Sequence, residues 1–298
     1  MSKRFDIRYR AFSISHKEHL LALQHIIGVD HVVIPVRDLD AAAQRWQAAG
    51  FTVSPRGKHS DYMGTANYTI VFDHDYMELM GIDHATPHNQ PTIDFLEQRE
   101  GIERAAFTTD DAAALAAELK NHGYNGEGPL AFGRPVSLPG GGTREARFQI
   151  ATWPVDEAPG GLRVFACQHL TRAAVWIPEL QQHANGAKRL VRLEIIANEP
   201  REAAAHMARL IDRQTEAIPD GFRVPSGGNR AVFEFLSAAA FARRYPDSVR
   251  QGAAATGAAA IVIASDQLEA LPGAVAHGEL VSLPAVQTTG VIVSFVAG

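Results

Sequence analysis

Two ionisable residues lie in stretches that otherwise read as apolar β-strands. His31 opens the β-prone run 31–36, and Glu78 lies inside the run 76–82. Charged residues are disfavoured in strands unless they are paired or bind an ion. Imidazole and carboxylate groups are both common ligands of divalent metals. The pair therefore indicates a metal site. An arginine facing Glu78 would also neutralise the carboxylate, so a metal-free cup with a Glu78–Arg104 ion pair is the alternative.

Arg104 is a candidate residue because of an internal repeat. Residues Gly28–Gly50 and Gly101–Gly123 have the same length, and each reads as a short strand, an acidic helix start, an Ala-rich helix and a final glycine. Such a repeat indicates one supersecondary unit used more than once. His31 of the first copy is matched by Arg104 of the second, so the scaffold is kept while the reactive group changes. The planar guanidinium of Arg104 suits a substrate carboxylate or phosphate.

The repeated unit is a βαβββ module. Asp38 or Asp40 caps its first helix, and Gly50 ends it. Strands of the first copy are expected at 31–36, 51–54, 67–72 and 76–82, and those of the second at 103–109, 147–152 and 162–169. Weaker third and fourth copies run from Leu190 to Ala297. The chain is therefore expected to hold two pairs of modules.

The segment GVDHVVIPVRDLDAA, followed by GTANYTIVFDHDYMELMGI, resembles the vicinal oxygen chelate superfamily, and more narrowly its glyoxalase-like domain proteins. The later segment CQHLTRAAVWIPELQQHANGA is also similar to that group. Members include glyoxalase I, extradiol dioxygenases, epimerases, fosfomycin-resistance transferases and metal-free drug-binding proteins. The resemblance implies an α+β fold of tandem βαβββ modules, with each pair of modules curving into a cup.

The resemblance also implies a ligand set. His31 occupies the first-strand ligand position and Glu78 the fourth-strand position. Arg104 occupies the matching position of the second module, but it stays cationic and cannot bind a metal. His169, near the end of the last strand of that module, is the expected third ligand. Two histidines and one carboxylate suit Fe(II) or Mn(II), and Zn or Ni are also possible.

Other residues are candidates for substrate contact or proton transfer. His59 lies in a loop that covers the cup in related proteins, and an ordinary imidazole pKa suits acid–base work beside the catalytic carboxylate of Glu78. Tyr62 and Asn67 share that loop or its flank. His183 resembles a recurring family position. All three are expected to help bind substrate. Cys167 reads as a buried, inert thiol.

The predicted organisation is an N-terminal arm (1–25), a first module pair with the active cup (26–171), a linker (172–189) and a degenerate second pair (190–298). The second pair contains neither a first-strand histidine nor a Y-x-E-L strand, which favours a structural or interface role. Isomerase, lyase or dioxygenase chemistry on a small substrate with vicinal oxygens is the expected function. The alternative is a metal-free protein that binds a small molecule or drug.

Composition narrows the choice of partners. The 298-residue chain carries a formal net charge of −5 and no basic run, which argues against nucleic acid. It has no apolar stretch long enough to span a membrane. A single cysteine fits a reducing cytosol, so a cytoplasmic location is expected. A homodimer is the default assembly for such a protein.

Overall fold

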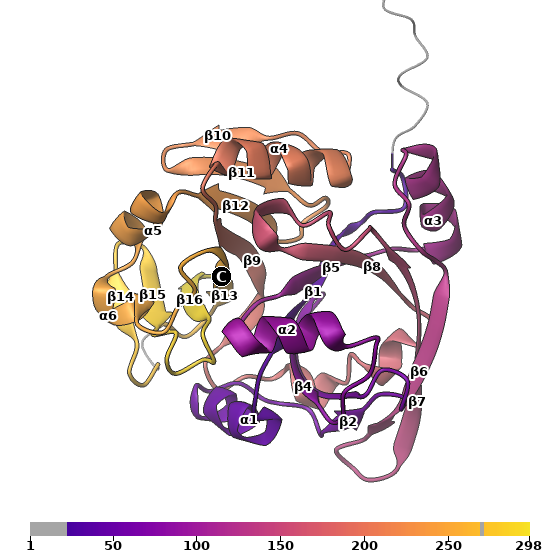
Figure 1. The fold of residues 1–298 in the computed structure, drawn as a ribbon. Helices are drawn as coiled ribbons and strands as arrows, with labels where there is room; N and C mark the ends of the chain where they lie inside the picture. The colour runs from indigo at the N-terminus through magenta and orange to yellow at the C-terminus, as the bar shows by residue number, and fades with distance from the viewer. Residues whose placement is uncertain (1–22, 269–270) are drawn as a thin grey trace, which may run out of the picture.

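The computed structural model describes residues 23–268 and 271–298, so most of the predicted N-terminal arm lies outside the described residues. Two eight-stranded mixed sheets form the molecule, one from each half of the chain (Figure 1). The predicted α+β fold of tandem βαβββ modules is confirmed. No helix in the described part of the chain is both long and apolar enough to cross a bilayer.

The first sheet has the strand order β2-β3-β4-β1-β5-β8-β7-β6. Its strands are β1 (Gly28–Pro35), β2 (Gly57–Lys58), β3 (Thr65–Val71), β4 (Tyr76–Ile82), β5 (Arg104–Thr108), β6 (Leu130–Ser137), β7 (Thr143–Thr152) and β8 (Arg163–His169). Its helices are α1 (Leu39–Ala48), α2 (Gln90–Gln98) and α3 (Ala112–Asn121). Strand β1 runs parallel to β4, and β5 runs parallel to β8. The two modules meet where β1 pairs with β5 in antiparallel fashion.

The second sheet repeats this order as β10-β11-β12-β9-β13-β16-β15-β14. Its strands are β9 (Ala187–Ile196), β10 (Glu216–Ile218), β11 (Gly221–Pro225), β12 (Val232–Leu236), β13 (Gly257–Ser265), β14 (Val275–His277), β15 (Leu280–Leu283) and β16 (Ile292–Ala297). Its helices are α4 (Pro200–Leu210), α5 (Ala238–Arg244) and α6 (Asp247–Arg250). Helix α4 lies over β11 and β12 (Figure 1).

Local sequence explains helices α1 and α3, the first helices of the two modules in the first sheet. The Asp38 carboxylate accepts a hydrogen bond from the backbone N–H of Ala41 at 2.9 Å, and Asp111 caps α3 in the same way. Trp46, on the inner face of α1, is fully buried. Gly50 follows the helix with a φ of 86°, a conformation that glycine adopts without strain. The predicted helix boundaries therefore rest on ordinary capping chemistry.

One large core joins the two halves. A single cluster of buried apolar side chains includes residues of α1, α3 and α4 and of both sheets. Smaller clusters lie on the opposite face of each sheet. On the first sheet, that face packs against short helical turns, η3 (Arg172–Ala174) and η4 (Pro178–Gln181), of the predicted linker. Because the core is shared, the expected domain limits stay a prediction.

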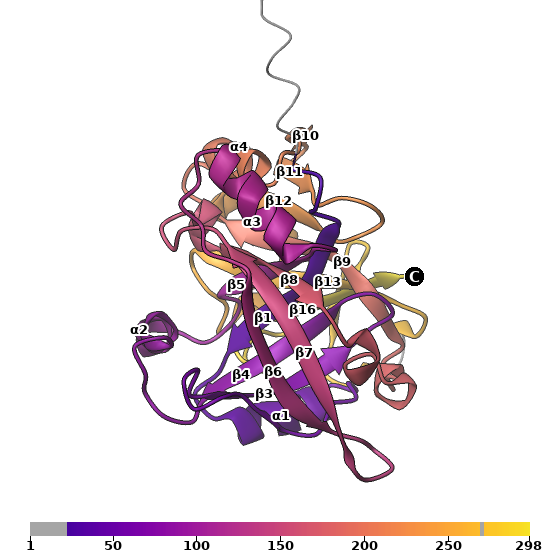
Figure 2. The same ribbon diagram turned by 90° about the vertical axis from the view of Figure 1, so that its right-hand side faces the viewer.

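One expected detail of the strands is wrong. Residues 51–54 form no strand, and the second strand is the two-residue β2. The repeat implied a further strand between α3 and β7 but gave no bounds for it, and this strand is β6, which contains Gly133 and Pro135. It lies at the edge of the sheet, where Pro135 can sit without an N–H to donate. It pairs with β7 in a long hairpin that extends along one side of the molecule (Figure 2).

A buried carboxyl group lies where the halves meet. Asp75, in the turn before β4, accepts a hydrogen bond from the backbone N–H of Leu190 at 3.0 Å. The side chain is almost completely buried. Burial raises the pKa of Asp75 to about 7, although the hydrogen bond from Leu190 and the charge of Arg230 oppose the shift.

This raised pKa predicts a pH-dependent stability. Between pH 3.8 and about 7 the folded state holds a proton on Asp75 that the unfolded state releases, so stability falls as pH rises through this window. We expect the free energy of unfolding of the wild type, relative to Asp75→Asn, to fall by about 4 kcal/mol from pH 4 to pH 8. Urea titrations across this range measure it. Asp73→Asn, at an exposed neighbour, is the control, and parallel pH profiles for wild type and Asp75→Asn would contradict the prediction.

Candidate functional site

His31 and Glu78 lie on one face of the first sheet. Alternation along β1 sends Val32 and Ile34 into the shared core and His31 to the opposite face. In the parallel pairing of β1 with β4, His31 lies opposite Tyr76, two residues before Glu78. The Nε2 atom of His31 is 3.9 Å from a carboxylate oxygen of Glu78. Both side chains are buried, so the structure brings them together.

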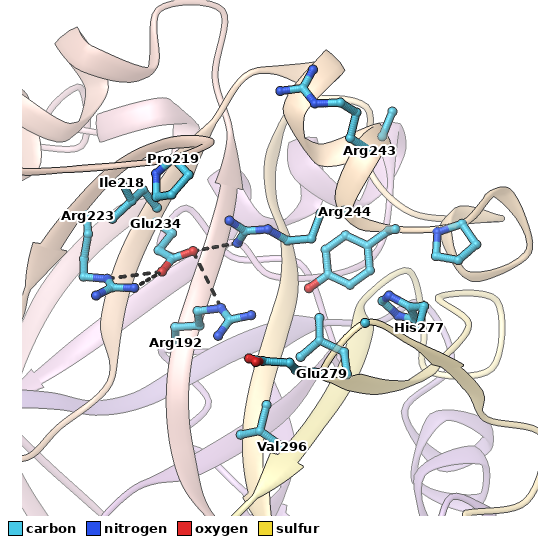
Figure 3. A pocket seen from close by; sticks show the side chains of 15 residues that line it. Arg192, Ile218, Pro219, Arg223, Glu234, Arg243, Arg244, His277, Glu279 and Val296 are labelled. Carbon is cyan, nitrogen blue, oxygen red and sulfur yellow. Dashed lines mark hydrogen bonds and ion pairs between the residues drawn. The ribbon is translucent and has the colours of Figure 1, made fainter.

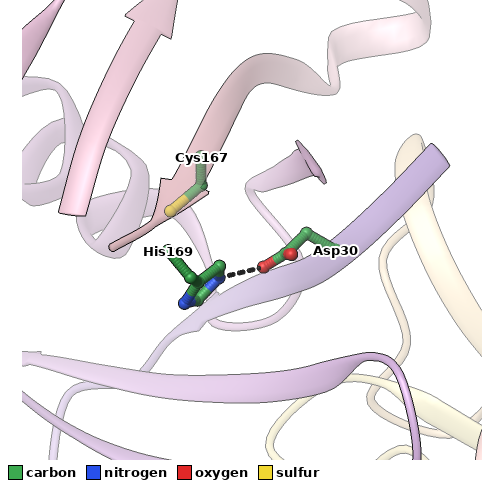
Figure 4. Close-up of side chains that lie close together, drawn as sticks. All are labelled: Asp30, Cys167 and His169. Carbon is green, nitrogen blue, oxygen red and sulfur yellow. Dashed lines mark hydrogen bonds and ion pairs between the residues drawn. The ribbon is translucent and has the colours of Figure 1, made fainter. Parts of the chain in front are cut away.

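Asp30 holds His31 in this orientation. Its carboxylate oxygen Oδ1 lies 2.7 Å from His31 Nδ1 and 2.9 Å from His169 Nε2, and the second oxygen accepts a hydrogen bond from the Thr108 hydroxyl. Figure 4 shows the contact with His169. Burial alone would raise the pKa of Asp30, but the charge and hydrogen bonds of the two histidines hold it well below its usual range.

A β-bulge makes this contact possible. In regular alternation, neighbours such as Asp30 and His31 point to opposite faces. The register of β1 against β5 shifts between Val29 and His31, and this irregularity lets both side chains share a face. A plain strand pattern gives no sign of it, and the sequence analysis therefore missed Asp30.

The possible ligand atoms of Asp30, Cys167 and His169 lie within 4.8 Å of one another (Figure 4). This group is a possible metal site. However, burial raises the pKa of the Cys167 thiol well above its usual value, so the thiol stays protonated. Asp30 already engages both histidines. The group is therefore better suited to orienting His31 than to binding an ion.

Glu78 lies between two imidazoles. Its other oxygen, Oε1, is 3.8 Å from His59 Nε2 and accepts a 2.6 Å hydrogen bond from the Asn67 amide. Burial alone would raise the pKa of Glu78, yet the imidazoles and the Asn67 hydrogen bond bring it below its usual range. Burial lowers the pKa of His59 to about 4, so His59 is neutral at pH 7. Among the described residues, the buried side-chain oxygen of Asn67 has no partner.

Arg134 is a site residue that the sequence analysis missed. It projects from strand β6 onto the same face and is only 8% exposed. Within residues 23–268 and 271–298 it has no hydrogen-bond or ion-pair partner. Burial lowers the pKa of Arg134, and the charge of Glu78 counteracts this. Gly57 makes room for it, because a Cβ atom there would come within 2.6 Å of an Arg134 nitrogen.

The other predicted site residues lie elsewhere. The expected Glu78–Arg104 ion pair is not formed, because Arg104 lies 2.8 Å from Glu103 and donates a 3.0 Å hydrogen bond to Thr92 of α2. Tyr62 is 73% exposed. His183 accepts a hydrogen bond from the N–H of Thr52 and contacts the Val71 carbonyl at 3.0 Å. Both of its ring nitrogens are therefore engaged by the backbone.

The second module offers no further ligand at the equivalent positions. Arg104 pairs with Arg163 as His31 pairs with Tyr76, so the counterpart of Glu78 is Phe165. The Phe165 ring packs edge-on against the His31 ring, with centroids 5.5 Å apart. This side of the cup is therefore apolar where a fourth ligand would stand.

The second sheet has a related arrangement. By the same register, Arg192 of β9 corresponds to His31, and Glu234 of β12 corresponds to Glu78. This half contains neither a first-strand histidine nor a Y-x-E-L strand, but an acid stands at the position of Glu78. An arginine replaces the histidine, and the two residues lie in an ion-pair network (Figure 3).

The sequence profile of the glyoxalase-like domain family matches residues 29–211, more than half of the chain. The protein therefore belongs to this family, and the resemblance inferred from the sequence is confirmed. A comparison with curated proteins found no match.

Solved structures share this fold. A hypothetical protein from Staphylococcus aureus superposes with a TM-score of 0.67 at 12% identity, over 91% of this chain and 99% of its own. The methylmalonyl-CoA epimerase of Mycobacterium tuberculosis matches 53% of this chain and 97% of its own, with 20% identity and a TM-score of 0.37. An epimerase from Streptomyces coelicolor, in complex with 2-nitronate-propionyl-CoA, covers 49% of this chain and 99% of its own at 19% identity and a TM-score of 0.39.

The hydrogen-bond geometry predicts where protons reside on the histidines. We expect protons on Nδ1 of His31 and on Nε2 of His169, because each of these atoms faces Asp30, and on Nε2 of His183, which faces a carbonyl. Long-range ¹H–¹⁵N spectra of the imidazoles report these positions directly. Exposed His74 is the reference for an unconstrained ring. A His31 ring with no proton on Nδ1 would contradict the role given to Asp30.

Proposed function

We propose that the protein is a divalent-metal-dependent enzyme that acts on a small substrate with two vicinal oxygens and a separate anionic group. The observation that carries this proposal is the buried carboxylate of Glu78, flanked by imidazole nitrogens at 3.8 and 3.9 Å. Nδ1 of His31 faces Asp30, so a ring that carries its only proton on Nδ1 directs the lone pair of Nε2 at Glu78. An imidazole lone pair and a carboxylate repel each other unless a cation lies between them.

The spacing suits a metal ion. Two ligands that each lie about 2.1 Å from one ion are at most about 4.2 Å apart. The 3.9 Å between His31 Nε2 and Glu78 falls within this limit. The Asn67 amide nitrogen faces Glu78, and its oxygen, which has no partner among the described residues, lies towards Gly57 and Arg134. A carboxylate hydrogen-bonded behind a histidine ligand is the usual support for such a ligand, and Asp30 supplies it.

The proposed ligand set differs from the sequence expectation at one residue. His31 and Glu78 are kept as ligands, whereas His169 holds Asp30 through its Nε2 atom and so acts on the site indirectly. Two protein ligands leave several coordination positions for substrate oxygens. A bound metal would supply Lewis-acid stabilisation of negative charge on those oxygens.

The remaining residues suggest what the chain itself does to a substrate. His59 is neutral at pH 7 and lies beside Glu78, so its Nε2 atom can take up or return a proton. Arg134 donates no hydrogen bond to the described part of the chain, and a guanidinium binds a carboxylate with two parallel hydrogen bonds. A proton-transfer reaction, such as isomerisation or a lyase step, uses this arrangement more fully than dioxygen chemistry does.

The second candidate is a metal-free protein that binds a small molecule. Arg134, rather than the expected Arg104, then balances the charge of Glu78. The homodimer and the cytosolic location expected from the sequence remain predictions in both cases.

Metal analysis separates the two candidates. We expect protein purified without chelator and then incubated with Mn²⁺ to bind about one ion per chain, and His31→Ala and Glu78→Ala to lose most of this binding. Titration calorimetry measures the stoichiometry, and circular dichroism checks the fold. His74→Ala, at an exposed histidine, is the matched control. A folded wild-type protein that binds no Mn²⁺, Fe²⁺, Zn²⁺ or Ni²⁺ would instead favour the metal-free candidate.

Arg134 predicts a preference for an additional carboxylate. With the Mn²⁺-loaded protein, we expect 2-oxoglutarate to bind about 10- to 100-fold more tightly than pyruvate, which has the same vicinal oxygens without the distal carboxylate. Arg134→Gln should abolish this difference, and Arg134→Lys should restore part of it. Arg147→Gln, at an exposed arginine of β7, should leave the ratio unchanged. A ratio near one in the wild type would remove Arg134 from substrate binding.

A further inference from the structure

We propose that the cup of the second sheet is a separate binding site for a small organic monocarboxylate. The cavity there has a volume of about 690 Å³. Polar side chains from β9, β11, β12, α5 and β14 line it, together with the residue that follows α5 (Figure 3). These polar residues are Arg192, Arg223, Glu234, Arg244, Tyr245 and His277. Neither His31 nor Glu78 lines this cavity, so this site is independent of the one described above.

One register position holds a different residue in each of the two cups. Arg192 lies at the register position of His31, and Glu234 lies at that of Glu78. In the first cup the proposed cation is a bound ion. Here the cation is part of the chain, because the guanidinium of Arg192 stays charged and cannot bind a metal. Substrate oxygens that a metal would bind therefore meet N–H donors instead.

The guanidinium groups around the cavity outnumber the buried carboxylates. Arg192, Arg223 and Arg244 contact the two buried carboxylates, Glu194 and Glu234, at distances of 2.6 to 2.9 Å. Three guanidinium groups thus face two carboxylates. The Arg223 side chain is 39% exposed and lines the cavity, so its charge is accessible to an anion that enters there.

The network also leaves donors available. Arg192 donates only through Nε, and Arg244 only through one terminal nitrogen, in the hydrogen bonds of the described residues. Tyr245 is fully buried and lines the cavity, and its hydroxyl lies beside Glu194 and Ser294 within the network. A closed structural network normally satisfies all its buried polar atoms. The unused donors of Arg192 and Arg244 are therefore suited to an acceptor that enters the cavity.

The rest of the lining indicates the kind of anion. Ile218, Leu280 and Val296 give the cavity an apolar wall that suits an aryl or branched aliphatic body. Exposed Glu279 at the rim repels anions of higher charge. One carboxylate on an apolar body fits both features better than inorganic phosphate does.

Benzoate is the probe for this site, and benzamide is its uncharged equivalent. We expect saturable calorimetric binding of benzoate in the millimolar range or below, and binding of benzamide at least about tenfold weaker. The anomalous signal of soaked 4-bromobenzoate should place it beside Arg192. Tyr245→Phe removes only a hydroxyl of the cavity wall, and Arg192→Lys keeps the charge but loses the planar fork. Each should weaken benzoate binding about tenfold.

Two control variants test whether the loss of benzoate binding arises in the second cup. Arg147→Gln removes an exposed arginine of β7 that does not line the cavity, and His31→Ala alters only the first cup. Both should bind benzoate like the wild type. The proposal is overturned if benzoate does not bind saturably or if Tyr245→Phe and Arg192→Lys bind it unchanged. Phosphate binding as tight as that of benzoate, or bromobenzoate located elsewhere, would overturn it as well.

Discussion

The first cup depends on the burial of one carboxylate. Asp30 is fully buried, and a charge in that position costs several kcal/mol unless donors surround it. Its three hydrogen-bond partners, His31, His169 and Thr108, come from β1, β8 and β5. Asp30 thereby ties together the strands at which the two modules meet. The same contacts fix the ring of His31 and direct its free nitrogen at Glu78, so the interaction that stabilises the junction also prepares the site.

The two sheets share one topology, but the groups that surround the buried acid differ between them. Glu78 has neutral neighbours at hydrogen-bonding or ion-binding distance and an arginine farther away. Glu234 instead contacts Arg223 and Arg244 directly. The first arrangement leaves a place for an added cation, whereas the second supplies its cations from the chain. The exchange of His31 for Arg192 at one register position underlies the different ligands proposed for the two cups.

The sequence predicted much of this fold because its signals are local. Alternating apolar residues, the Asp38 cap and the glycine after α1 define one module, and the repeat then predicts the others. His31 and Glu78 could be chosen because ionisable groups in apolar strands are costly. Asp30 and Arg134 could not be identified from the sequence. The first shares a face with His31 only through a β-bulge, and the second lies on an edge strand whose Gly133 and Pro135 resemble a loop.

The two modules of the first cup contribute different residues to it. His31 and Glu78 belong to the neighbouring strands β1 and β4, so the pair proposed to bind an ion is held within one module. The second module contributes Phe165 where another ligand would lie, and Arg134 from its outermost strand. An ion held by only two protein ligands binds weakly until substrate oxygens complete its coordination. Metal and substrate affinity are then coupled, and by linkage each must increase the other by the same factor.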